Sequence, residues 1–225
     1  MSDRAPDGLL GACVDAGRRP PIRTVRRKFV SMLFAIFSLM LWADAASAIT
    51  PAGTVDAVSG SCTAHRRVLK RNDAVQVGDT VDVPAGGKLK LRMADGSVIS
   101  VAPDSNMTVA TYDIGSAGRH AKLSLTWGLL RAVVVAVGGP STFEVSTTVG
   151  TASVRSADAD WFIEAKPGSV RVGVEAGTIE LTSAATGRSV KIPANWGGSQ
   201  MAGREPALPR PWPRDELDEN KARTK

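Results

Sequence analysis

Apolar and polar residues alternate over most of the chain between Ala52 and Ile192, and no 11-residue window there shows convincing helical periodicity. The clearest case is Lys88–Met93, where every second residue is apolar. An Asp95-Gly96 turn and a second apolar-rich run, Ser97–Val101, follow it. Because glycine tolerates the positive φ of a tight turn, this segment predicts a β-hairpin.

Three further short strands are predicted at Ser169–Val174, Thr178–Leu181 and Ser189–Ile192. Glycines at positions 168, 177 and 187 introduce them, at spacings of nine and ten residues. Short strands at such intervals are typical of all-β architectures. We therefore expect an all-β single domain, built as a twisted β-sandwich or a β-solenoid-like stack, although the strand order cannot be read from the pattern.

The most continuous apolar run is Leu129–Val137, which is rich in β-branched residues and ends at Gly138-Gly139-Pro140. A run of this kind predicts a central strand that is buried on both faces, rather than a helix.

The N-terminal segment has the organisation of an export signal. Basic residues at 26–28 precede the apolar run Phe29–Trp42, and the small-residue site Ala46-Ser47-Ala48 follows. As a helix the run would be about 21 Å long, short of the roughly 30 Å thickness of a bilayer core. We expect residues 1–48 to be an export signal that is cleaved after Ala48, which places the remainder in the periplasm.

Three alternatives stay open for this segment. The stretch before Arg26 is long for a signal, so the true start codon could lie further along. Arg26–Val30 also fits a twin-arginine motif, which leaves the general and twin-arginine export routes both open. An uncleaved segment would instead anchor the domain at the inner membrane, facing the periplasm.

Beyond the signal, we expect a β domain at residues 49–203 and a different segment at residues 204–225. The latter holds four prolines and an acidic run among basic residues. Such a composition offers little apolar surface to offset the entropy of ordering, and it predicts a disordered tail.

Charge argues against nucleic acid as a partner. The formal net charge is +6, but residues 1–48 carry seven Lys/Arg and four Asp/Glu, so half of this excess belongs to the signal. The basic cluster at residues 65–71 comes nearest to the basic surface that binds nucleic acids, and we interpret it as a solvated edge.

Cys62 is the only cysteine after the signal, so no internal disulfide is available. Its expected role is that of a small buried residue.

The sequence offers no catalytic residues, no metal site and no cofactor. His65 and His120 lack neighbours at metal-ligand spacing. No G-x-S-x-G motif is present, and the glycine-rich stretches match no phosphate-binding motif. Asp158 and Asp160 are better interpreted as exposed carboxylates of a turn than as an acid/base pair. We expect a protein that is not an enzyme.

Candidate binding residues come from the few aromatics and one arginine. Exposed aromatics stack sugars, so Trp127 and Trp196 are candidates, although burial in the core is the expected role of both. Trp212 lies between two prolines and could anchor a partner, while a solvated tail with an incidental tryptophan is the simpler interpretation. Arg155 is the fourth candidate binding residue.

The order and spacing of several motifs over Ile49–Met201 resemble the FecR-type domain. The motifs are Gly53-Thr54-Val55, Val58-Ser59-Gly60, Val77–Val81, Gly87–Leu91, Met93–Ser97, the Val98–Val101 strand, Trp127–Arg131, Phe143–Thr147, Gly150–Arg155 and Val170–Val174 with Glu175–Ile179. The resemblance implies an all-β periplasmic domain. In the iron-dicitrate system that names the family, such a domain belongs to a transmembrane regulator, which relays the state of an outer-membrane transporter to a sigma factor.

The chain departs from that regulator in three respects. Residues 1–28 are too short to be its cytoplasmic anti-sigma segment, and residues 204–225 stand where its receptor-docking domain would be. Ser156 and Ala157 replace a common glycine and threonine. We therefore expect a stand-alone, exported FecR-like domain that acts as a non-enzymatic module and binds an envelope protein or polymer. The alternatives are a membrane-anchored component of a sigma-regulator-like signalling system and a small-ligand or glycan binder.

Overall fold

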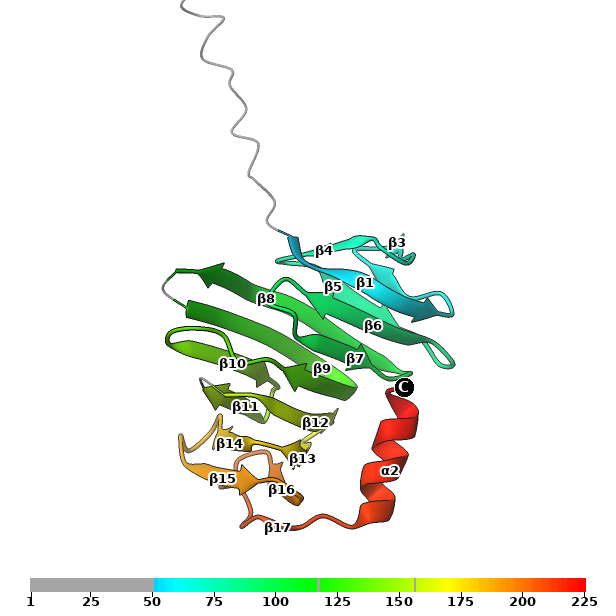
Figure 1. Ribbon diagram of the computed structural model, residues 1–225. Coiled ribbons are helices and arrows are strands. Elements are labelled where there is room, and N and C mark those ends of the chain that lie inside the picture. The colour runs from blue at the N-terminus through cyan, green and yellow to red at the C-terminus, as the bar shows by residue number, and fades with distance from the viewer. Residues whose placement is uncertain (1–50, 117, 156) are drawn as a thin grey trace, which may run out of the picture. The chain divides into compact units, whose positions relative to one another are not determined.

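Strand β9 (Gly118–Val134) is the longest element among the described residues, and two ladders of strands meet along it. The computed structural model describes residues 51–116, 118–155 and 157–225 (Figure 1). The predicted export signal and its cleavage site after Ala48 lie outside the described residues.

The first ladder has the order β4–β1–β6–β7–β9–β12–β13–β16–β17. Its other strands are β1 (Pro51–Ser59), β4 (Ala74–Gln76), β6 (Lys88–Met93), β7 (Val98–Val101), β12 (Ala159–Lys166), β13 (Ser169–Ala176), β16 (Trp196–Met201) and β17 (Arg210–Pro211).

The second ladder has the order β3–β2–β5–β8–β9–β10–β11–β14–β15. Its other strands are β2 (Thr63–Ala64), β3 (Arg67–Val68), β5 (Thr80–Val83), β8 (Ser105–Gly115), β10 (Ser141–Ser146), β11 (Gly150–Arg155), β14 (Thr178–Ser183) and β15 (Ser189–Pro193).

Strand β9 changes ladders at Trp127 and Gly128. Residues up to Trp127 pair with β8, and residues from Gly128 onward pair with β12. Gly128 has φ +102°, and a Cβ there would lie 2.1 Å from Ser105 Oγ. Only glycine therefore allows the strand to bend at this point and continue into the other ladder.

The two ladders enclose one apolar core. Alternate residues of β9, such as Leu123, Leu125 and Leu130, are fully buried. The ladders are in direct contact, since a Cβ at Gly198 in the first would lie 2.5 Å from Ile192 Cδ1 in the second. Every second strand residue thus faces the opposite ladder, which is the arrangement that period-two sequences favour.

The all-β prediction is confirmed, and several predicted elements are present. The hairpin of Lys88–Met93 is β6 and β7, with Gly96 at φ +87°. The three glycine-introduced strands are β13, β14 and β15. Cys62 is fully buried, as expected. The run that begins at Leu129 is central, but its strand ends at Val134 and Val135 is exposed.

The prediction of a disordered tail is wrong. Residues 204–225, called the tail below, contain β17 and the helix α2 (Arg214–Arg223). Leu217 is 7% exposed and packs with Trp212 against the first ladder, so two apolar anchors offset the cost of ordering a charged segment. No helix among the described residues has the length and apolarity needed to span a bilayer.

Candidate functional site

The outer face of the first ladder, turned away from the core, carries the tail. Side chains of β9, β12 and β13 that alternate with core residues form this face, and α2 lies against it (Figure 1). We call the residues that receive the tail the tail seat: Leu129, Phe162, Arg171, Gly173 and Gly197.

Two glycines make room for an indole ring. Gly173 of β13 and Gly197 of β16 are cross-strand partners. A Cβ at Gly173 would lie 1.5 Å from Cζ3 of Trp212, and one at Gly197 would lie 2.7 Å from Cε3 of the same ring. Glycine weakens a strand interior, but here it opens a flat surface on which Trp212 lies directly on the backbone.

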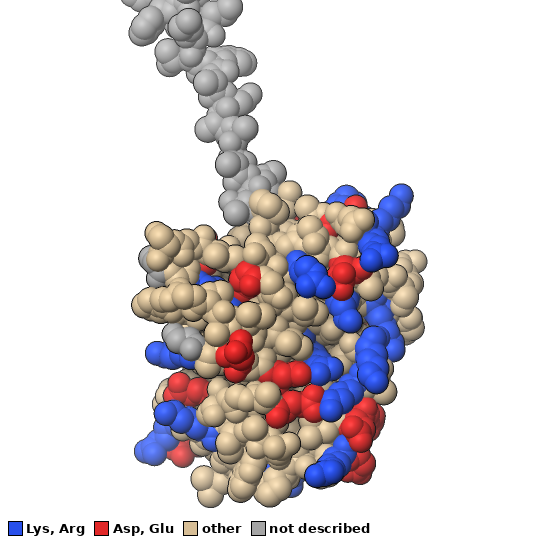
Figure 2. Space-filling model, in the orientation of Figure 1, with Lys and Arg blue, Asp and Glu red and all other residues tan. Residues whose placement is uncertain are grey.

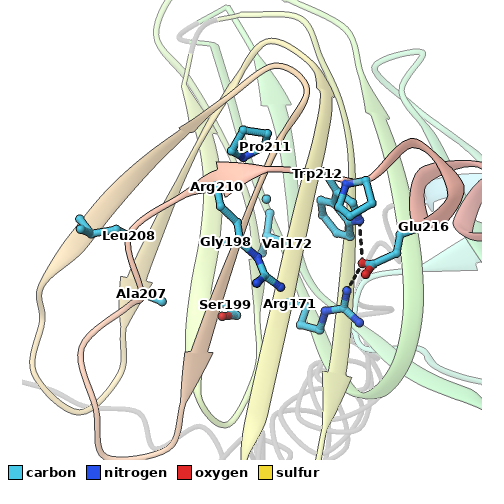
Figure 3. Close-up of a pocket in the computed structure, with 12 residues that line it drawn as sticks. Arg171, Val172, Gly198, Ser199, Ala207, Leu208, Arg210, Pro211, Trp212 and Glu216 are labelled. Carbon is cyan, nitrogen blue, oxygen red and sulfur yellow. Dashed lines mark hydrogen bonds and ion pairs between the residues drawn. The ribbon is translucent and has the colours of Figure 1, made fainter.

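Arg171 and Glu216 hold the ring from its polar side. Trp212 Nε1 donates a hydrogen bond of 2.9 Å to Glu216 Oε2, and Arg171 forms an ion pair with the same carboxylate (Figure 3). The Arg171 guanidinium carbon also lies 5.7 Å from the Trp212 ring centroid, within the range of a cation–π contact. The indole N–H, the ring face and the carboxylate are thus all satisfied within one cluster.

Further ion pairs join α2 to the sheet. Arg223 Nη1 lies 3.3 Å from Glu164 Oε1, and Lys221 pairs with Glu175. Glu175 also accepts from Arg131, which holds Asp160 with two hydrogen bonds of 2.9 and 2.7 Å. The hydrogen bonds that Arg131 donates to Asp160 are the main cause that raises the pKa of Arg131, which stays cationic. Partly exposed pairs contribute little singly, so the tail is held mainly by Trp212 and Leu217 and is positioned by charge.

A cavity of about 170 Å³ lies beside the indole, between the sheet and the start of the tail. Arg171 and Arg210 both line it, with Ser199 and Leu208 on its other walls (Figure 3). Basic and acidic side chains intermingle over the visible face of the molecule (Figure 2). The two arginines and the indole suit a ligand that carries both a carboxylate and an apolar group.

A second concave region surrounds Trp127, where β9 changes ladders. Hollows of about 520 and 290 Å³ are both lined by Trp127 and Asp104. Trp127 is 47% exposed. The expected core burial of Trp127 is therefore wrong, because the residue precedes the Gly128 bend and faces outward.

The other candidates occupy different places. Trp196 is 38% exposed at the start of β16, where it pairs with Pro211, so its expected burial is also wrong. Trp212 lies near it, since the Trp212 amide donates to Asn195 O. Arg155 is exposed at the end of β11 and lines neither concave region.

Other polar groups are engaged in structure. The basic cluster at residues 65–71 forms the exposed β2–β3 edge, and His65 Nδ1 lies 2.9 Å from Asp79 Oδ1. Asp158 is exposed, whereas Asp160 is the partner of Arg131.

Burial raises the pKa of the Cys62 thiol, and the thiol therefore stays protonated. Among the described residues, no three His, Cys, Asp or Glu side chains are grouped to hold a metal ion.

Sequence reasoning missed the tail seat, and two signals could have indicated it. Asp215 and Glu216 occupy the first turn of α2, and Lys221 and Arg223 the last, which is the charge order that a helix dipole favours. Gly173 interrupts an apolar β-branched strand, which indicates a close approach of another group. Neither signal identifies the partner of the glycine, because Trp212 lies 39 positions further along the chain.

Comparison with known proteins places this geometry in context. Residues 79–180 match the family described as FecR protein. Two crystal structures of a candidate anti-sigma factor from Parabacteroides distasonis, at 1.65 and 2.50 Å resolution, are similar in fold, with TM-scores of 0.51 and 0.52 and 16% sequence identity. The match covers 62% of this chain and 62% of those chains, so it leaves more than a third of each protein outside the likeness. No curated protein matches the chain in sequence.

Proposed function

Since the chain carries a FecR domain over residues 79–180, we propose that it is a non-enzymatic interaction module of the periplasm that binds a segment of an envelope protein at the tail seat. The family and the fold shared with an anti-sigma factor support a role of the signalling-regulator kind. The partner segment in this proposal carries an aromatic residue followed by acidic residues.

One observation carries the proposal: the sheet face already binds such a segment in its own tail. Trp212 fills a space that two strand glycines leave open, and Glu216 meets Arg171 beside it. The contact is built from one aromatic anchor, one buried leucine and partly exposed ion pairs. A contact with so few anchors is weak enough to exchange with a partner of the same chemistry. An aromatic residue beside an arginine is also the usual centre of a protein interface.

Site-specific photo-cross-linking in cells tests the proposal. A photoreactive amino acid at Ser199, which is exposed and lines the cavity, would report what lies at the seat. Trp212→Ala should release the tail and increase cross-linking to a discrete envelope protein. Adding Gly173→Leu should abolish that product, because leucine fills the indole space. Trp127→Ala is the matched control and should leave it unchanged.

Two results would refute the proposal. One is the absence of any cross-linked product in the Trp212→Ala protein. The other is a product that persists when Gly173→Leu blocks the seat. A product of twice the chain mass that contains only this chain would assign the seat to a second copy instead.

The membrane-anchored signalling component remains the second candidate, and the N-terminus of the native protein separates the two. We expect N-terminal sequencing of protein purified from cells to begin at Ile49, after a cleaved signal. Recovery of an intact N-terminus in the membrane fraction would favour the anchored form.

A further inference from the structure

The region around Trp127 lies apart from the Trp212 indole, although Arg223 of α2 reaches its wall, and it has the features of a ligand site. Scattered exposed apolar residues are normal on protein surfaces and need no explanation. Trp127 differs from these because it lines two hollows, of about 520 and 290 Å³, which are of the size of small-ligand sites. The indole and Asp104 thus line both hollows.

The hollows are lined with groups that bind hydroxyls. The smaller one contains Ser61, Thr63, Asp82 and Asp104. The larger one contains Glu164 and Lys166, with two prolines and Arg223 of α2 on its walls. Asp82 is held by the Asn106 side-chain amide. The Asp104 carboxylate and the indole N–H of Trp127 make no hydrogen bond to another described residue, and both can meet a ligand.

The position of Trp127 is fixed before any ligand arrives. Its backbone pairs with Asn106 of β8, and the next residue, Gly128, packs its backbone against Ser105. An aromatic platform on paired strands needs little ordering on binding, which favours affinity.

We propose that this depression binds a neutral oligosaccharide, with one pyranose ring stacked on Trp127 and its neighbours hydrogen-bonded in the two hollows. The axial C–H face of a pyranose is apolar and matches an indole, while its equatorial hydroxyls match carboxylates and hydroxyls at the rim. The carboxylates of Asp82 and Asp104 repel polyanions from the smaller hollow, while Lys166 and Arg223 of the larger hollow are paired with Glu164, which disfavours nucleic acids and acidic glycans. This inference adds a ligand class to the chain and rests first on Trp127 and the smaller hollow, which no residue of the tail lines.

Titration of the purified chain with chitotetraose, cellotetraose and maltotetraose, followed by NMR of the tryptophan indole signals, tests the inference. At least one of these neutral tetrasaccharides should shift the Trp127 signal in a saturable manner. Trp127→Ala should weaken its binding by about tenfold or more, and Trp127→Tyr should retain part of the affinity. Trp196→Ala, a matched loss of an exposed tryptophan, should leave binding unchanged.

A heparin tetrasaccharide serves as the polyanionic control and should not shift the Trp127 signal. Asp104→Asn should weaken binding of the neutral sugar without altering the fold, since the residue is outside the core. The inference is overturned if none of the three neutral sugars shifts the signal at millimolar concentration. It is equally overturned if Trp127→Ala binds as tightly as the wild type, or if the heparin fragment is preferred.

Discussion

Asp95 and Arg119 show how single residues join the two ladders. Both side chains are fully buried and form an ion pair. Tyr112 donates a hydrogen bond of 2.7 Å to the same carboxylate, and the Ser97 hydroxyl donates one of 2.8 Å. Arg119 also donates to Val135 O, so the guanidinium ties the end of β9 to its beginning. A buried pair of this kind tolerates the loss of either partner poorly.

The sequence indicated only half of this cluster. The Asp95-Gly96-Ser97 turn is readable, because its glycine and its short-range hydrogen bonds are local. Arg119 lies 24 residues away, and its side chain reaches Asp95 only because β9 runs between the ladders. Long-range partners of this sort depend on strand order, which the alternation of residues does not encode.

The acid stability of the protein should depend on Asp95. Burial acts to raise the pKa of its carboxyl, but the hydrogen bonds from Tyr112, Arg119 and Ser97 together hold that pKa below its ordinary value. A lowered pKa in the folded state stabilises the protein above the ordinary pKa of about 4, and the gain is lost as pH falls through the lowered value. Asp95→Asn should destabilise the protein at pH 7 by roughly 3 kcal/mol, since Arg119 is left unpaired.

Urea unfolding between pH 7 and pH 2 measures this effect. The wild type should lose stability steeply at the acid end, and Asp95→Asn should show a shallower dependence there. Asp113→Asn, which removes an exposed carboxylate of β8, is the control and should follow the wild type. Equal slopes for Asp95→Asn and the wild type would contradict the role given to this carboxylate.

At the scale of elements, the sheet was predictable and the tail was not. Strands β6, β7, β13, β14 and β15 follow from period-two alternation and glycine turns, which are local signals. Helix α2 has a single buried side chain, Leu217, so it has almost no amphipathic pattern. Ten residues are too few for a stable isolated helix, and α2 therefore owes its order to the seat on which it lies.

Gly173→Ala should consequently unfold α2 and spare the sheet. The new methyl group would collide with the Trp212 ring, which has no other place on the seat. Hydrogen exchange should show loss of protection over residues 214–223 and retained protection in β12 and β13. Gly115→Ala is a matched strand substitution into open space and should leave exchange in α2 unaltered. Retained protection of α2 in the Gly173→Ala protein would show that Trp212 is not its anchor.

At the scale of the whole molecule, the shared strand β9 makes the two ladders one unit. Each ladder alone would lack a central strand, because β9 pairs with β7 and β12 in one ladder and with β8 and β10 in the other. The sequence predicted a central strand near Leu129, but not that its first half serves a second ladder. The change of ladder depends on the bend at Gly128, and the sequence pattern does not reveal the positive φ of this residue.

Gly128→Ala should therefore weaken both ladders together. The substitution adds a Cβ at a positive φ and against Ser105, and we expect a loss of roughly 3 kcal/mol. For a domain of this size, that loss corresponds to a melting temperature lower by roughly 10 °C. Calorimetry should still show one transition, with exchange in β5 and β13 increasing in parallel. A separate early transition of one ladder would refute the single-unit description.

The path of β9 also sets the order in which the native state can be reached. Its 17 residues pair with strands from both earlier and later parts of the chain, from β7 (Val98–Val101) to β12 (Ala159–Lys166). No part of the chain that ends before β12 can complete the centre of the first ladder. Closing contacts over such sequence separations slows folding, so the chain should stay without its central pairing until its later strands are available. A domain of this design is kinetically slow to form, and the same long-range pairing prevents either ladder from separating without the other.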